Sequence, residues 1–193
     1  MNLKQKVTAV IPQLEPHWKD VSGFFKTRTI PQKTTLLEDG DISKYIYMVS
    51  KGCLRLFVIK DDGKEVTVQF FFENQMVASM GSAFTGKPGR MYLESIEESE
   101  VIMIRLQDFR ELFVKFDELK HLLIQFLQKR LLYYADLYTS FILNTPAERY
   151  IKLVEDNPGI TERVPHYYIA TYLGITPVSL SRIRSRLAKK NQH

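Results

Sequence analysis

Apolar and polar residues alternate along short runs in the first half of the chain, and this period of two predicts β-strands. The runs lie between residues 21 and 106, and turn-forming residues separate them. The clearest runs are 45–49, 54–59, 66–70 and 100–104. Residues 61–64 read Asp-Asp-Gly-Lys, which predicts a hairpin closed by a type I′ turn. Strands at this spacing favour a sandwich or barrel-like roll.

A different period begins near Leu119 and continues to Leu143. Apolar residues recur there at intervals of three and four, and no Gly or Pro interrupts them, which predicts one long amphipathic helix. At about 1.5 Å per residue, this helix would be a rod of roughly 37 Å. Its apolar stripe requires a partner, either the β domain of its own chain or the same helix of a second chain. We favour pairing of two chains, although Arg130 interrupts the coiled-coil pattern.

Local signals after residue 144 predict a small helical domain. Thr145-Pro146-Ala147-Glu148 combines a capping Thr, a Pro at the first helical position and a Glu at the third. Gly174 can end a later helix in the left-handed conformation. Thr176 and Pro177 can start the next helix, and the small Ala170 allows two helices to cross closely. This combination predicts a helix-turn-helix.

The last predicted helix has two contrasting sides. At about 100° per residue, Leu180, Ile183 and Leu187 share one side, whereas short polar and basic residues occupy the other. A helix of this kind suits the major groove of DNA, where Arg can bridge guanine O6 and N7. The candidate DNA-binding residues are Thr176, Val178, Ser179, Ser181, Arg182, Ser185, Arg186 and Lys189.

The charge distribution supports this interpretation. The chain has 27 Lys and Arg residues and 22 Asp and Glu residues, a formal net charge of +5. Residues 165–193 contain five of the cations and none of the carboxylates, so the whole excess lies on the predicted helix-turn-helix segment. A solvated basic tail would have the same charge, but the helical pattern favours nucleic-acid binding.

Other function classes lack the residues that they need. The four histidines lie outside the strand region, and the lone Cys53 cannot form a cluster, so we expect no cupin-type metal, haem or iron–sulfur site. No nucleophile and base are paired in the sequence, so we expect no enzyme. The chain contains no apolar run of about 18 residues and no signal-peptide pattern at its start, so we expect a cytoplasmic protein.

Together these segments resemble the Crp/Fnr family of bacterial transcription regulators. The resemblance spans about Val21 to Leu187, and the segments 37–41, 47–52, 62–65 and the helix-turn-helix carry it. It implies an α+β fold with a double-stranded β-helix (jelly-roll) sensor domain at 1–117, a dimerisation helix at 118–144 and a winged-type helix-turn-helix domain at 145–193. It also implies a homodimer, a palindromic site on double-stranded DNA and RNA polymerase as a further partner, without a membrane.

The predicted DNA reader departs from the family pattern. Pro177, Val178 and Arg182 stand where the family often reads bases, and only Arg182 keeps a typical base-reading side chain. Val178 replaces a frequent acidic residue, so the family's best-known target site is not expected here. Little of the chain follows Leu187, which leaves little room for wing strands.

The predicted ligand pocket departs further. Family members that bind cyclic nucleotides carry a Gly-Glu pair for the ribose and an Arg-Ser pair for the phosphate, where this chain has Ala78-Ser79 and Gly89-Arg90. Without the carboxylate, cyclic AMP is not expected as the effector, although a one-residue shift of the loop 84–89 would let Arg90 meet a phosphate. The candidate pocket residues are Ala78, Ser79, Met80, Gly81, Ser82, Arg90, Met91, Tyr92 and Tyr134.

Two questions remain open at this point. The roll holds either a small-molecule effector or a filled core that only keeps the dimer in one shape. We predict a sequence-specific DNA-binding regulator, and the alternative is a ligand-sensing module that acts through protein contacts, with a degenerate helix-turn-helix. Steeply salt-dependent DNA affinity distinguishes the two functions.

Overall fold

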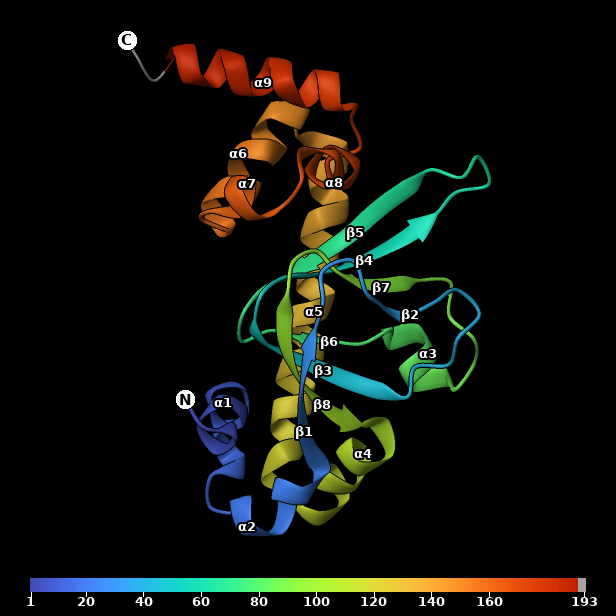
Figure 1. The fold of residues 1–193 in the computed structure, drawn as a ribbon, viewed down its shortest axis with the longest axis vertical. Coiled ribbons are helices and arrows are strands. Elements are labelled where there is room, and N and C mark those ends of the chain that lie inside the picture. The colour runs from blue at the N-terminus through green and yellow to red at the C-terminus, as the bar shows by residue number, and fades with distance from the viewer. Residues whose placement is uncertain (191–193) are drawn as a thin grey trace. The chain divides into compact units, whose positions relative to one another are not determined.

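The computed structural model describes residues 1–190, and of Lys190 only the backbone (Figure 1). The last three residues of the predicted 145–193 domain therefore lie outside the described part. The chain divides into two compact units. The first, called the β unit here, comprises Met1–Val58 and Gln69–Phe126, and the second, called the helical unit, comprises Ile59–Val68 and the residues from Leu127 onward.

Two four-stranded antiparallel sheets face each other in the β unit. One has the strand order β1 (Phe25–Ile30), β8 (Ser99–Arg105), β3 (Tyr45–Lys51) and β6 (Met76–Val77). The other has the order β2 (Thr35–Leu37), β7 (Tyr92–Ser95), β4 (Leu54–Ile59) and β5 (Glu65–Phe71). The strands predicted at 45–49, 54–59, 66–70 and 100–104 are confirmed as parts of β3, β4, β5 and β8.

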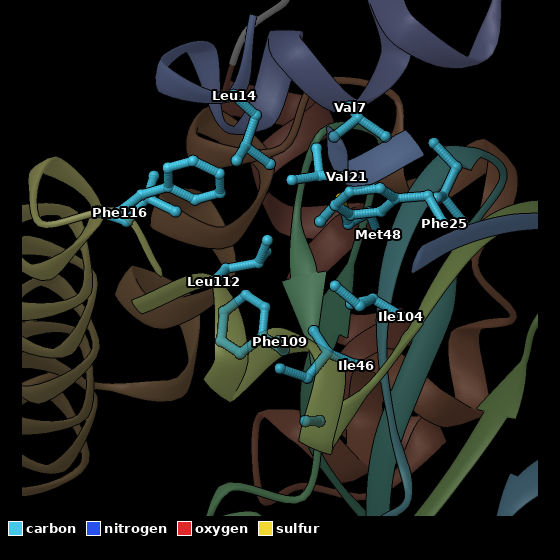
Figure 2. Close-up of a cluster of buried hydrophobic side chains, with 13 residues drawn as sticks. Val7, Leu14, Val21, Phe25, Ile46, Met48, Ile104, Phe109, Leu112 and Phe116 are labelled. Carbon is cyan, nitrogen blue, oxygen red and sulfur yellow. The ribbon is translucent and has the colours of Figure 1, made fainter. Parts of the chain in front are cut away.

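Alternation along the strands of the first sheet builds two separate cores. Ile46 and Ile104 point away from the second sheet and join Val7 and Leu112 in a cluster covered by helices, as Figure 2 shows. Side chains of the opposite parity, such as Val49, fill the space between the sheets. The covering helices are α1 (Leu3–Val10), α2 (Trp18–Val21), α4 (Leu106–Lys115) and the start of α5 (Glu118–Leu143), with short 3-10 turns at Pro12–Leu14 and Ser22–Phe24. Each apolar face of a sheet is stabilised by burial against another layer of helices or strands.

The turn between β4 and β5 differs from the predicted type I′. That turn needs positive φ at both central residues, but Gly63 alone in this loop has it, at +79°. Gly63 N donates to Lys60 O at 2.8 Å, and Lys60 N donates to Lys64 O at 2.9 Å. The loop is therefore three residues long, with Gly63 in the left-handed position. The predicted type I′ turn was wrong, because that turn has a two-residue loop.

The helical unit contains α6 (Pro146–Asp156), α7 (Ile160–Arg163), α8 (His166–Tyr172) and α9 (Pro177–Lys190), with the second half of α5. The predicted cap at Thr145 is confirmed, because the side chains of Thr145 and Glu148 each bond the other residue's backbone N–H. The tip of the β4–β5 hairpin belongs to this unit, and Thr67 N donates to Thr171 Oγ1 of α8 at 3.3 Å. No helix in residues 1–190 is both long and apolar enough to cross a membrane.

Candidate nucleic-acid interface and ligand pocket

The turn between α8 and α9 has the geometry that its residues predict. Gly174 has φ of +70° and follows the end of α8, and Ile175 N returns to Ala170 O at 3.0 Å. Thr176 Oγ1 then accepts the backbone N–H of Ser179 at 3.1 Å, which caps α9. Ala170 is fully buried at the crossing of the two helices, where a larger side chain would force them apart. A helix-turn-helix is therefore present.

One side of α9 anchors the helix to this unit. Leu180 is only 1% exposed, and Ile183 and Leu187 are half-buried beside it. Leu173 and Ile169 of the preceding segment are also buried, so α8 and α9 share an apolar contact. This anchoring leaves the other side of α9 to the solvent.

The candidate DNA-binding residues lie on that open side. Seven of the eight are exposed, and the eighth, Ser179, is half-buried at the cap. Arg182, Arg186 and Lys189 form no ion pair with any carboxylate of residues 1–190. The exposed face of α9 thus combines unneutralised positive charge with short polar side chains.

Arg184 differs from the other arginines of α9. Its side chain is half-buried, and its guanidinium hydrogen-bonds to the imidazole of His166 at the start of α8. The guanidinium is the donor in this contact, because arginine has no acceptor atom. Arg184 thus serves the packing of α9 on α8.

Arg149 joins three segments at the base of the helix-turn-helix. Its guanidinium lies over the Phe141 ring of α5, 4.5 Å from the centroid. It also donates to Asn144 O at 2.6 Å and to Leu173 O, at the end of α8, at 3.0 Å. Sequence reasoning missed this residue, because an Arg inside an amphipathic helix gives no local sign of distant carbonyl partners.

A second link connects α5 to α8 through two tyrosines. The hydroxyls of Tyr133 and Tyr172 lie 3.3 Å apart, and burial raises the pKa of both above the ordinary value. Both hydroxyls therefore stay protonated and hydrogen-bonded. The two tyrosines thus join α5 to α8 within the helical unit.

The nine candidate pocket residues are dispersed. Ala78 and Ser79 line a cleft of about 300 Å³ between the two sheets. Met80 instead lines a separate apolar cavity of about 80 Å³ beside α4, and Ser82 is buried, its Oγ accepting the backbone N–H of Ser43 at 2.9 Å. The cleft therefore brings together only Ala78 and Ser79 of the nine, and Ala78 also lines the apolar cavity with Met80.

The remaining candidates lie elsewhere. Gly81 is exposed on α3 (Met80–Thr85), Met91 packs against the core between the sheets, and Tyr92 stacks on Phe57. Tyr134 belongs to the helical unit, where its ring packs edge-on against Tyr133.

Arg90 points into solvent and does not line the cleft. Gly89 beside it is tied to residues 40–41, because Gly89 N donates to Asp41 O at 3.0 Å and Gly40 N donates to Gly89 O at 2.9 Å. A Cβ at Gly89 would lie 2.9 Å from Ser79 Oγ, so the backbone approaches the floor of the cleft closely here. These bonds oppose the one-residue shift that would bring Arg90 inward.

Sequence reasoning missed most of the residues that form the cleft. Arg28, Lys44 and Tyr45 stand near its opening, and Tyr47 and Ser43 are buried within it. Only Arg28 could have been suspected from the sequence, because it lies two residues from the buried Ile30 and thus on the same side of β1. No group of three or more His, Cys, Asp or Glu side chains in the described residues could hold a metal ion.

Comparison with known proteins places these features in a family context. Residues 27–116 match the family described as the cyclic nucleotide-binding domain. A "Cyclic AMP receptor protein" of Thermus thermophilus is 24% identical over 92% of this chain and 84% of its own length. The structure of FixK2 from Bradyrhizobium japonicum superposes with a TM-score of 0.75 at 16% identity, covering 86% of each chain. A putative regulator of the crp/fnr family from Eubacterium rectale reaches 0.69 at 16% identity, covering 91% of this chain and 87% of its own.

Proposed function

Since the chain is a Crp/Fnr-type transcription regulator with a cyclic nucleotide-binding domain, and not an enzyme, we propose that it acts as a homodimer that reads a palindromic site on double-stranded DNA. The two copies of α9 would enter successive major grooves about 34 Å apart, one turn of the double helix. A further contact with RNA polymerase would follow from the same family role.

The exposed face of α9 carries this proposal. Arg182, Arg186 and Lys189 are open to solvent and unpaired with carboxylates, and Leu180 holds the helix from behind. Basic side chains on an anchored helix can contact phosphates on both sides of the groove while short residues approach the bases. A helix used only for protein contacts would not need a face that carries several unpaired cations and no carboxylate.

Arg182 and Lys189 are expected to contribute to DNA binding in different ways. In vitro selection with the purified protein would first give a preferred sequence. On that sequence, Arg182→Ala should lose about 1–3 kcal/mol and relax the preference at one base pair, because the bidentate guanine contact is lost. Lys189→Ala should weaken all sequences about equally, because a phosphate contact carries no sequence information. Fluorescence anisotropy on the selected site and on single-base variants separates the two effects.

Lys152 offers a control for the loss of one positive charge. It is exposed on α6 and already paired with Asp156 at 3.4 Å, so Lys152→Ala should leave DNA affinity nearly unchanged. If Arg182→Ala bound the selected site as tightly as the wild type, the base-reading role of Arg182 would be wrong.

The exposed side of α5 supports the homodimer. Ile124, Leu131 and Tyr138 repeat every seven residues and are 52%, 70% and 71% exposed. Tyr134 follows Leu131 at a spacing of three and is exposed as well. The opposite side of the helix, with Leu119 and Tyr133, packs on its own chain. A seven-residue apolar repeat left open on a long helix is the pattern by which two helices pair.

Leu131→Asp is expected to convert the dimer to a monomer. The substitution places a carboxylate in the middle of the open repeat, and in a two-fold pair it would bring two like charges into an apolar seam. Because Leu131 is exposed in the single chain, the fold of the monomer should survive. Size-exclusion chromatography with light scattering reports the mass directly. Gln125→Asp adds the same charge off the repeat and should remain dimeric, and a dimeric Leu131→Asp would argue against this seam.

Cyclic AMP is not expected to be the effector. Ala78 and Ser79 offer no carboxylate to the ribose hydroxyl, and Arg90 lies outside the cleft in solvent. A buried ligand hydroxyl and a cyclic phosphate would both be left without their partners, which costs more than the stacking of the base returns. Calorimetric titration should therefore show no binding of cyclic AMP in the micromolar range. Micromolar binding that Arg90→Ala abolishes would overturn this expectation.

A further inference from the structure

The cleft between the two sheets of the β unit is open to solvent at one end. It measures about 300 Å³, at the lower end of the range of about 300–1,000 Å³ typical of small-molecule sites. All of its lining residues belong to the β unit. It meets the positions aligned with the nucleotide-binding cassette only at Ala78 and Ser79, and neither Arg90 nor the loop 84–89 lines it.

The opening of the cleft has an excess of positive charge. Arg28 of β1 and Lys44, just before β3, are both exposed there, and neither forms an ion pair within the described residues. Asp41 is the one carboxylate in the lining, and its Oδ2 already accepts the backbone N–H of Glu38 at 3.0 Å. Two cations therefore face the opening against one carboxylate that a turn partly engages.

The strand register directs Arg28 into this opening. Arg28 pairs with Val101 of β8, and Val101 pairs in turn with Val49 of β3. Val49 and Val101 both belong to the core between the sheets, and Ile30, two residues along β1 from Arg28, is buried in the same core. Arg28 thus lies on the inner face of its sheet, beside the apolar core that Ile30, Val49 and Val101 help to form.

The floor of the cleft offers hydrogen bonds that the protein itself uses weakly. Tyr47 is 7% exposed, and its Oη reaches Leu36 O only at 3.5 Å, the outer limit of a hydrogen bond. Burial raises the pKa of Tyr47, and the nearby Arg28 acts in the opposite direction, so the hydroxyl is a protonated donor close to a cation. Ser79 adds a second hydroxyl-bearing side chain, and Leu37 and Leu93 supply apolar walls.

We propose that this cleft binds a small organic anion, a carboxylate or phosphate ester with a compact apolar body, and that Arg28 is its charge partner. The apolar body would contact Leu37 and Leu93, while the anionic group meets Arg28 and Lys44 at the opening. Tyr47 Oη would exchange its long bond to Leu36 O for a shorter one to the ligand. This site goes beyond the proposed DNA binding, and it rests on that function only for the consequence that binding changes DNA affinity.

Calorimetry on the full chain with two anionic probes tests the site. Phenyl phosphate and 3-phenylpropionate represent the phosphate and the carboxylate, and 3-phenylpropanol is the uncharged comparison. At least one anion should bind, and the alcohol should bind at least about tenfold more weakly, because a charge-assisted hydrogen bond is lost. Which of the two anions binds more tightly identifies the anionic group that the site prefers.

One arginine-to-glutamine variant and one lysine-to-glutamine variant test which cation contacts the anion. Arg28→Gln should weaken the better anion at least about tenfold. Lys26→Gln removes an exposed cation from the same strand that does not line the cleft, and it should change binding less than about twofold. Thermal unfolding of both variants should match the wild type, since both side chains are exposed.

Three results would overturn the site. They are no binding of either anion at millimolar concentration, equal binding of the alcohol, and anion binding that Arg28→Gln leaves unchanged. The titrations contain no DNA, so any of these leaves the proposed DNA binding intact. Conversely, if Arg182→Ala did not change DNA binding, the assignment of the cleft as an anion site would still stand.

Discussion

Raising the salt concentration from about 50 mM to about 200 mM should weaken binding to the selected DNA site about a hundredfold. Each protein cation that contacts a phosphate releases a condensed counterion, and the entropy of that release falls as the salt concentration rises. Arg186 and Lys189 supply two exposed cations per chain for phosphate contacts, since Arg182 is assigned to a base, so a dimer presents about four on its two copies of α9. The effect is the largest that we expect for this protein.

Fluorescence anisotropy over a series of salt concentrations measures this effect as the slope of log affinity against log salt. Lys189→Ala should make the slope shallower by about two per dimer, because each of its two copies loses one phosphate contact. Lys152 is already paired with Asp156, so Lys152→Ala serves as the control and should leave the slope unchanged. Affinity that hardly varies with salt would favour the alternative function, a sensory module that acts through protein contacts alone.

Leu180→Ala should destabilise the helical unit by about 2–5 kcal/mol. Leu180 is 1% exposed, and it is the central side chain by which α9 packs on α8. Its removal leaves a cavity that the buried neighbouring side chains can fill only in part. Because total stabilities are about 5–15 kcal/mol, this change should also release α9 from its position and reduce DNA affinity.

Urea unfolding followed by far-ultraviolet circular dichroism measures the loss. Val178→Ala is the matched control, because Val178 lies two residues earlier on the same helix and is 60% exposed. Its effect on the free energy of unfolding should stay within about 0.5 kcal/mol. Equal midpoints for the two variants would show that Leu180 does not anchor α9, and the argument for a helix held from behind would fail.

Features that depend on a few neighbouring residues could be predicted from the sequence. The cap at Thr145, the left-handed Gly174 and the cap at Thr176 all occur where their residue types place them. Each of these requires only one side chain and the backbone within about four residues of it. The four predicted strands follow from the same kind of locality, since side chains along a strand alternate between its faces.

Features that depend on the register between distant segments could not be predicted from the sequence. The hairpin at Gly63 closes one residue differently from the predicted turn, because the pairing across the loop and not the Asp-Gly pair alone sets its length. Arg149 reads as one more charged residue of an amphipathic helix, yet its partners are carbonyls 5 and 24 residues away. The nine candidate pocket residues came from alignment to a family cassette, and only Ala78 and Ser79 meet at the cleft.

The amino-acid sequence by itself determined the order of strands and helices, the helix-turn-helix and the concentration of positive charge on its last helix, because periodicity, caps and charge are properties of neighbouring residues. Only the tertiary structure decided which side of α5 is buried against its own chain and which repeat, at Ile124, Leu131 and Tyr138, stays open. It also decided that Arg28, rather than Arg90, stands at the opening of the cleft. Both outcomes depend on how strands and helices far apart in the chain pack together, and no local pattern encodes that packing.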